Sequence, residues 1–180
     1  PDALVLEHRA ADVARLAPLL TKALAAALRN LQVMRRREGA ALGRDLRRRF
    51  SALAAAAARI EARAPRVADA YRQALLARLR DVLPGQPLAG DDRLLKEIAL
   101  FADRADITEE LVRLRSHLAQ ARGLLRSDGV AGRTLDFIVQ EMGREINTIG
   151  SKANDGDITR RGIAFKTELE RIREQVQNIE

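Results

Sequence analysis

Several residue types that build common sites and cores are scarce or missing in this 180-residue sequence. It has no cysteine and no tryptophan, one tyrosine and four phenylalanines. The missing cysteines exclude disulfides and thiolate metal sites, and they favour a reducing, cytoplasmic location. With so few aromatics, aliphatic side chains and alanine must build the core, which is a balance typical of packed helices rather than of a β-sandwich.

Two further absences concern the hydrophobic pattern. No apolar run approaches the roughly 20 residues that span a bilayer, so we expect no membrane partner. Alternation with a period of two residues is also absent, whereas apolar residues recur every three or four positions along most of the chain. The sequence therefore predicts an all-α fold.

We expect two domains. Residues 1–84 are predicted to form a long N-terminal helical hairpin, and residues 85–180 a compact C-terminal helical bundle. The boundary falls in residues 83–91, which hold two prolines and two glycines and predict a loop. Within the bundle, Asp91 and Asp106 are placed to cap helices. The expected helices cover about 12–64, 65–82, 91–104, 106–126, 133–149 and 157–179.

Three apolar stripes with helical spacing are candidates for the core. The first is interrupted at Glu38, which we expect to pair with Arg35 inside a helix interface. The N-terminal stripe consists of Leu16, Leu20, Leu24, Leu28, Leu31, Met34, Leu42, Leu46, Phe50, Leu53 and Ile60. The bundle stripes are Leu135, Ile138, Met142, Ile146 and Ile149, and Phe165, Leu169, Ile172, Val176 and Ile179.

The charge balance favours a polyanionic partner. There are 32 basic and 25 acidic residues, which give a net charge of +7. Seven arginines fall within residues 35–49, a band that would attract phosphates. A compositional drift of the genome toward arginine explains the excess equally well. No aromatic residues interleave with this band, so a base-stacking platform is not expected there.

Residues 132–152, GRTLDFIVQEMGREINTIGSK, are the most informative stretch. Besides the apolar stripe, helical spacing gives two mixed stripes of acids, bases, amides and hydroxyls, which suggest a site. One holds Asp136, Gln140, Arg144, Asn147 and Ser151, and the other holds Phe137, Glu141, Glu145, Thr148 and Lys152.

This stretch resembles the C-terminal part of the bacterial YicC/YloC family of endoribonucleases. The similarity continues in KTELERIREQVQNIE (166–180) and RLLKEIALFADRADITEELVRLRSHL (93–118). It implies cleavage of single-stranded regions of RNA with Mn²⁺ or Mg²⁺, without DNA specificity. It also implies a further N-terminal domain and a homo-oligomer, for which a hexamer is one candidate. This sequence has Gly143 where the family usually has Asn.

Hydrolysis of a phosphodiester can use a metal held by carboxylates on facing helices. We therefore expect Glu141, Glu145 and His117 to be catalytic, with Glu110, Glu141 and Glu145 as metal ligands. These groups should meet in a polar groove between the helices that begin near Asp106 and Arg133. The expected RNA-binding residues are Arg113, Arg133, Gln140, Arg144, Asn147, Lys152 and Arg173. In a cleavage without metal, His117 would be the general base.

Other interpretations stay open at this point. Glu141 could pair with Arg144 or Arg133, and Glu145 with Lys152 or Arg113, as a packed ionic seam without catalytic chemistry. The same arginines would also serve a non-catalytic RNA-binding or adaptor module. The stripe over residues 165–179 would equally suit a helical oligomerisation domain.

Overall fold

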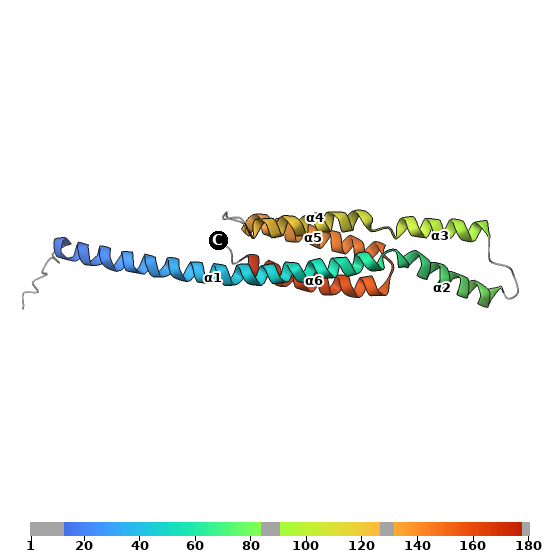
Figure 1. Ribbon diagram of the computed structural model, residues 1–180, viewed down its shortest axis with the longest axis horizontal. Coiled ribbons are helices and arrows are strands. Elements are labelled where there is room, and N and C mark those ends of the chain that lie inside the picture. The colour runs from blue at the N-terminus through green and yellow to red at the C-terminus, as the bar shows by residue number, and fades with distance from the viewer. Residues whose placement is uncertain (1–12, 84–90, 127–131, 178–180) are drawn as a thin grey trace, which may run out of the picture. The chain divides into compact units, whose positions relative to one another are not determined.

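The computed structural model describes residues 13–83, 91–126 and 132–177. These residues form six α-helices and no strand (Figure 1), which confirms the all-α prediction. The helices are α1 (Val13–Arg63), α2 (Arg66–Val82), α3 (Asp92–Arg104), α4 (Thr108–Leu124), α5 (Gly132–Lys152) and α6 (Gly156–Val176). Within the described residues, none of these helices is both long and apolar enough to cross a membrane.

The chain divides into two compact units, residues 1–42 and 43–180. The described part of the first unit is the beginning of α1 alone. Its large apolar side chains are 44–68% exposed: Leu16, Leu19, Leu20, Leu24, Leu28, Leu31, Val33 and Met34. Arg35 and Glu38 are exposed as well. The prediction that these two residues lie inside a helix interface is therefore wrong for this chain.

The second unit contains a four-helix bundle built from the second half of α1 with α4, α5 and α6. Arg49 and Arg63 of α1 pair with Glu168 and Asp155 of α6, at 2.6 and 2.8 Å. Because the later residue of α1 meets the earlier residue of α6, these two helices are antiparallel. Helix α5 packs against both α4 and α6.

Helix α4 is the remaining neighbour of α1. Glu61 pairs with Arg115, and the Arg47 guanidinium donates to the Leu125 carbonyl at 3.3 Å. This reversed order makes α1 and α4 antiparallel too. The four helices thus form a ring in which α1 and α5 lie on one diagonal and α4 and α6 on the other.

The core of the bundle lies along helical stripes of aliphatic residues. The stripe of α5 from Leu135 to Ile149 and the stripe of α6 from Phe165 to Val176 are at most 4% exposed, as predicted. Ile179 lies outside the described residues. The second half of α1 contributes Leu46, Phe50, Leu53, Ala57 and Ile60, and α4 contributes Leu111, Leu114, Leu118 and Ala121.

Helices α2 and α3 form a separate pair within this unit. The Tyr71 and Phe101 rings stack with their centroids 3.6 Å apart, and the Tyr71 hydroxyl donates to Glu97 at 3.3 Å. Helix α2 therefore packs along α3 rather than back along α1. The compact units divide after residue 42 and not near residue 84, because the helices on either side of the 83–91 segment pack together.

Candidate functional site

Helix α5 presents three different sides. One side carries the buried aliphatic stripe, and a second side faces α4 and carries Glu145 and Lys152. The third side points away from the core. At 3.6 residues per turn, each side repeats every three or four residues, so one helix can hold a core, an ionic contact and a solvent surface at once.

The contact between α4 and α5 is an ionic seam centred on Arg113. The Arg113 Nε donates to Glu145 Oε1 at 2.7 Å, and another guanidinium nitrogen lies 2.6 Å from the Glu109 carboxylate. Glu145 is 8% exposed, so its charge depends on this partner. The hydrogen bond from Arg113 to Glu145 is the main reason that the pKa of Arg113 is raised.

A second pair closes the seam at the end of α5. Lys152 Nζ donates to Glu110 Oε1 at 2.9 Å, and Glu110 is 3% exposed. The other oxygen, Glu110 Oε2, is buried and has no hydrogen-bond partner among the described residues. Lys152 is therefore the main neutralising charge for a carboxylate that water barely reaches.

Asp106 lies one residue before the N-cap of α4, which is Ile107, so it orients the start of this helix without being the cap itself as predicted. Its carboxylate accepts from the Thr108 hydroxyl at 2.6 Å and from the Thr108 backbone N–H at 2.9 Å. These hydrogen bonds, with the hydroxyl first, lower the pKa of Asp106, and the charge of Lys152 adds to the effect. Glu110 lies on the first turn of α4, opposite the end of α5.

The predicted metal ligands do not assemble into one cluster. In the part of the chain that the structure describes, no three His, Asp or Glu side chains are placed to hold a metal ion. Glu110 and Glu145 pair with bases across the seam, and Glu141 pairs with Arg144 at 2.7 Å. These contacts are the ones expected for an ionic seam, so the catalytic and metal roles stay predictions.

His117 lies on α4 and is half-buried. Its Nδ1 is shielded from solvent and has no hydrogen-bond partner among the described residues. The side chains predicted to share one groove fall into separate contacts: Arg113 pairs with Glu145 between α4 and α5, whereas Arg144 pairs with Glu141 on the exposed side of α5. No hydrogen bond links His117 to either pair in the described structure.

The solvent side of α5 forms a continuous exposed stripe. Its members are spaced by four and three residues in turn, and all of them are exposed. We call this the α5 stripe: Arg133, Phe137, Gln140, Arg144, Asn147 and Ser151. From Arg133 to Ser151 it extends about 27 Å along the helix. Two guanidiniums, two amides, a hydroxyl and an aromatic ring therefore share one line on the surface.

Four of the seven predicted RNA-binding residues belong to the α5 stripe, and the other three do not. Arg113 and Lys152 are engaged in the ionic seam. Arg173, on α6, has its Nε 3.6 Å from Asp136 Oδ1 on α5. The structure therefore separates the predicted set into a solvent-facing group and a group that links helices.

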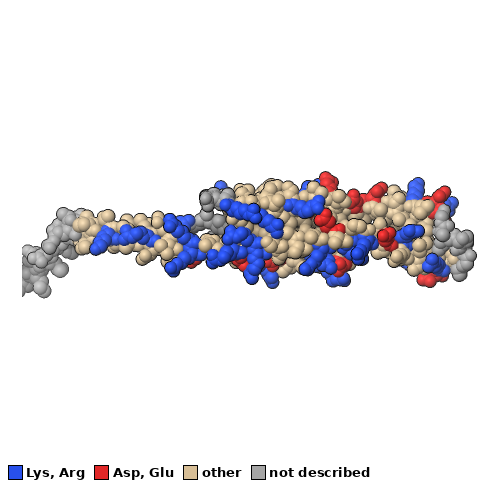
Figure 2. Space-filling view, in the orientation of Figure 1, with Lys and Arg blue, Asp and Glu red and all other residues tan. Residues whose placement is uncertain are grey.

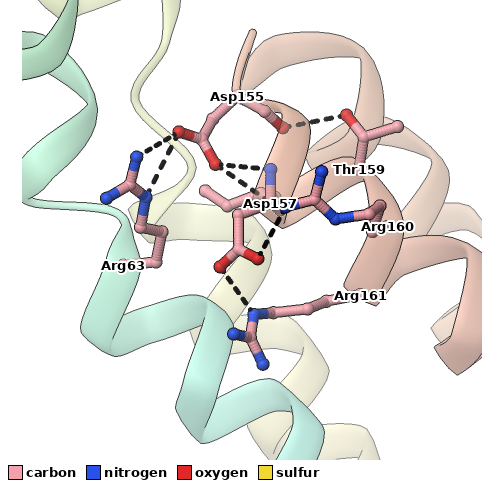
Figure 3. Close-up of polar contacts among 7 residues, drawn as sticks. Arg63, Asp155, Asp157, Thr159, Arg160 and Arg161 are labelled. Atoms are coloured by element: carbon pink, nitrogen blue, oxygen red, sulfur yellow. Dashed lines mark hydrogen bonds and ion pairs between the residues drawn. The ribbon is translucent and has the colours of Figure 1, made fainter.

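A junction that the sequence did not reveal holds the far end of the bundle (Figure 3). Asp155 Oδ1 accepts from the backbone N–H groups of Asp157 and Ile158, both at 3.0 Å, and so caps α6. Its Oδ2 accepts from Arg63 at 2.8 and 3.2 Å. The hydrogen bond from Arg63 is the largest cause of the lowered pKa of Asp155. One carboxylate thus joins the end of α1 to the start of α6.

The turn before this cap depends on Asn154. Its φ of 44° lies in the left-handed region, which Asn tolerates better than most residues. This reversal ends α5 directly after Lys152 and brings Asp155 to the start of α6. A cap of this kind can be predicted from an Asp at the end of a turn, but Arg63 is 92 residues away and carries no local signal.

Basic side chains cover much of the visible surface (Figure 2). In the first unit, residues 13–42 hold six basic residues and one acidic residue. The arginine band continues into the second unit, where structural contacts use part of it: Arg48 and Arg49 pair with Asp45, and Arg49 also pairs with Glu168. Part of the arginine band is therefore engaged in contacts within the protein, and the band is less available to bind phosphate than its sequence suggests.

Comparison with known proteins identifies the family to which these helices belong. Residues 60–180 match the family model described as "Endoribonuclease YicC-like, C-terminal". The chain belongs to this family. Over 180 residues it is 40% identical to the probable endoribonuclease YicC of Clostridioides difficile, and over 176 residues it is 34% identical to the protein of the same name from Haemophilus influenzae. These matches cover 100% and 98% of the chain.

The chain spans about three fifths of the length of these YicC relatives, 61% and 60% respectively. The part that matches the YicC-like C-terminal model contains α2 to α6, and so it includes the ionic seam and the α5 stripe. The resemblance noted in the sequence is thereby confirmed at the level of the family.

Proposed function

We propose that this chain is the helical C-terminal part of an endoribonuclease and that it contacts single-stranded RNA through the α5 stripe. The observation that carries the proposal is the exposed line of guanidinium, amide and hydroxyl groups within the region that matches the family. Arginine forks suit phosphate oxygens, and amides can read sugar or base edges.

The stripe is supported by a rigid base. The ionic seam fixes α5 against α4, and the aliphatic core fixes it against α6. Two stripe residues are also held locally: Arg144 by Glu141 at 2.7 Å and Gln140 by Asp136 at 2.6 Å. Such contacts restrict the rotamers of both side chains and lower the entropy lost when they bind a ligand.

A charge deletion on the stripe tests the binding surface. In the full-length protein, Arg144→Ala should weaken binding of a single-stranded RNA by about 3- to 10-fold and reduce the salt dependence of binding by about one counterion. Arg160→Ala is a matched control, because both side chains are about three quarters exposed (73% and 76%) and each pairs with an acid three residues earlier. Equal losses in both variants would contradict a specific α5 surface.

Dependence on Mn²⁺ or Mg²⁺, implied by the resemblance, is a separate part of the proposal. The described acids do not form a ligand set, so we assign no step to a metal here. Glu141→Gln in the full-length protein tests the predicted role of Glu141. If this residue is catalytic, cleavage of a stem–loop RNA should fall sharply at every metal concentration while RNA affinity is kept. An unchanged cleavage rate would leave Glu141 as an ion-pair partner of Arg144.

A non-catalytic RNA-binding module is the second candidate. It is favoured by the pairing of Glu110, Glu141 and Glu145 with bases, which leaves no assembled acid group in the described residues. Retention of RNA without cleavage by the full-length protein, in the presence of either metal, would support this candidate.

A homo-oligomer, with a hexamer as one candidate, is proposed for the whole protein. Its molar mass, measured by light scattering, tests this proposal.

A further inference from the structure

One aromatic side chain stands apart from the other four. Phe50 and Phe165 are buried in the bundle, and Tyr71 stacks on Phe101. Phe137, the second residue of the α5 stripe, is 59% exposed and has no aromatic partner in the described structure. It is the most exposed ring of the chain, and every other member of the α5 stripe is polar.

We propose that Phe137 stacks on a base of single-stranded RNA while its stripe neighbours hold the backbone. This inference rests on the proposed function and adds a base-contacting residue to it. A phenyl ring offers a face to any of the four bases, so stacking gives affinity with little sequence preference. The bases of a duplex are already stacked on one another, so the same ring favours unpaired nucleotides.

The neighbours of Phe137 favour stacking on a base over burial of the ring against another apolar surface. Arg133 precedes it by four residues and Gln140 follows by three, so their Cβ atoms lie about 5–6 Å from that of Phe137. All three side chains are exposed. A cation and an amide beside a ring supply the phosphate and edge contacts that accompany a stacked base.

A protein partner is the less favoured occupant of this position. The centre of a protein interface is typically a group of apolar side chains depleted of charge. The residues three and four positions from Phe137 are Arg133, Thr134, Gln140 and Glu141, none of which is apolar. A single exposed apolar residue on its own is ordinary. The donors around this ring are what point to RNA.

The chain contains no tryptophan, so Phe137→Trp introduces a single indole at the proposed contact, which can be excited selectively at wavelengths that Tyr71 does not absorb. Titration of this 180-residue variant with an unstructured oligoadenylate RNA should quench its emission, because a stacked base quenches indole fluorescence. The same strand in a duplex with oligouridylate should quench far less. Quenching that depends on protein concentration without RNA would instead identify Phe137 as a protein contact and overturn the proposal.

Affinity measurements complete the test. Phe137→Ala should weaken oligoadenylate binding by about 5- to 150-fold. Ile163→Ala is the matched control, because Ile163 on α6 is 60% exposed, and it should leave binding unchanged. Circular dichroism checks the fold of each variant. If the unsubstituted chain binds but neither Phe137 variant responds, the stacking role is wrong and the proposed function survives. If the unsubstituted chain and the full-length protein both fail to bind, the proposed function fails.

Discussion

The two halves of α1 have similar sequences and opposite surroundings. In the first half, Leu20, Leu24 and Leu28 are 68, 61 and 50% exposed, whereas in the second half Leu46 and Phe50 are fully buried. Both halves carry apolar residues at steps of three and four. Only the second half, from Gly43 on, has α4 and α6 beside it in its own compact unit. Apolar periodicity therefore predicts a helix and its apolar face, but it does not reveal whether anything covers that face.

The largest expected difference between the two halves of α1 is in the free energy of unfolding when one apolar side chain of each half is truncated to alanine. Phe50→Ala should lower the free energy of unfolding by about 3–5 kcal/mol, because it leaves a cavity in the bundle. Leu24→Ala should change it by less than about 0.5 kcal/mol, because Leu24 is exposed and alanine favours the helix. Urea unfolding followed by circular dichroism measures both. A large loss for Leu24→Ala would show that the first half is covered in solution.

Helix α4, which packs against the second half of α1, carries two adjacent acids of the ionic seam that differ in exposure. Glu110→Ala should lower the free energy of unfolding by about 2 kcal/mol. This is less than for a fully buried pair, because the Lys152 side chain is 37% exposed. Glu109→Ala removes an acid that is 77% exposed and should cost less than about 0.5 kcal/mol. Equal losses would mean that the burial of Glu110 has no energetic consequence.

Asp155 fixes the end of the covered half. Asp155→Ala should lower the free energy of unfolding by about 1–2 kcal/mol near neutral pH, through loss of the α6 cap and of the contact with Arg63. The pKa of Asp155 is lowered in the folded chain. Its stabilisation is therefore full above the unfolded pKa of about 3.9 and is lost as the pH falls through the lower folded value.

The pH dependence gives an independent measurement of this contact. Below about pH 4, the stability of the unsubstituted chain should fall more steeply than that of Asp155→Ala, because the variant has no such proton to bind. Urea titrations at a series of acidic pH values compare the two slopes. Parallel curves would indicate that the Arg63 contact does not persist in solution.

The smallest expected effect uses the same substitution in both units. An added Cβ would meet no atom within 4 Å at either Gly39 or Gly143. Gly143→Ala, in the bundle, should raise the free energy of unfolding by about 1 kcal/mol. Gly39→Ala, in the first unit, should raise helix content without moving the midpoint of bundle unfolding. A shift of that midpoint by Gly39→Ala would show that the two halves of α1 unfold together.

Much of the fold could be predicted from the sequence because it follows from local rules. Asp91 and Asp106 mark helix starts, and the stripes of α5 and α6 mark their buried sides. Pairing between helices depends on contacts distant in the sequence, such as Arg49 with Glu168, which no local pattern encodes. For this reason the sequence suggested a hairpin of α1 with α2, whereas α2 packs along α3.

The location of the candidate site could be predicted from the sequence, but the contacts of its individual charged residues could not. The stretch 132–152 was singled out because its polar residues are too varied for an ordinary solvated face, and it does carry the exposed stripe. Which of its charges would be used in packing could not be decided, since Glu141 and Glu145 are the same residue type one turn apart on the same helix. Only the position of α4 shows that Glu145 pairs with Arg113 in the seam, whereas Glu141 pairs with Arg144 on α5 itself.

The stack of Tyr71 on Phe101 gives the molecule a built-in optical reporter. Tyr71 is the single tyrosine, and no tryptophan masks its emission or its near-ultraviolet signal. Because the ring lies between α2 and α3, its spectrum reports separation of that pair, while the far-ultraviolet signal reports the melting of all helices together. The unsubstituted chain can thus reveal, without any attached dye, whether α2 and α3 separate before the four-helix bundle unfolds.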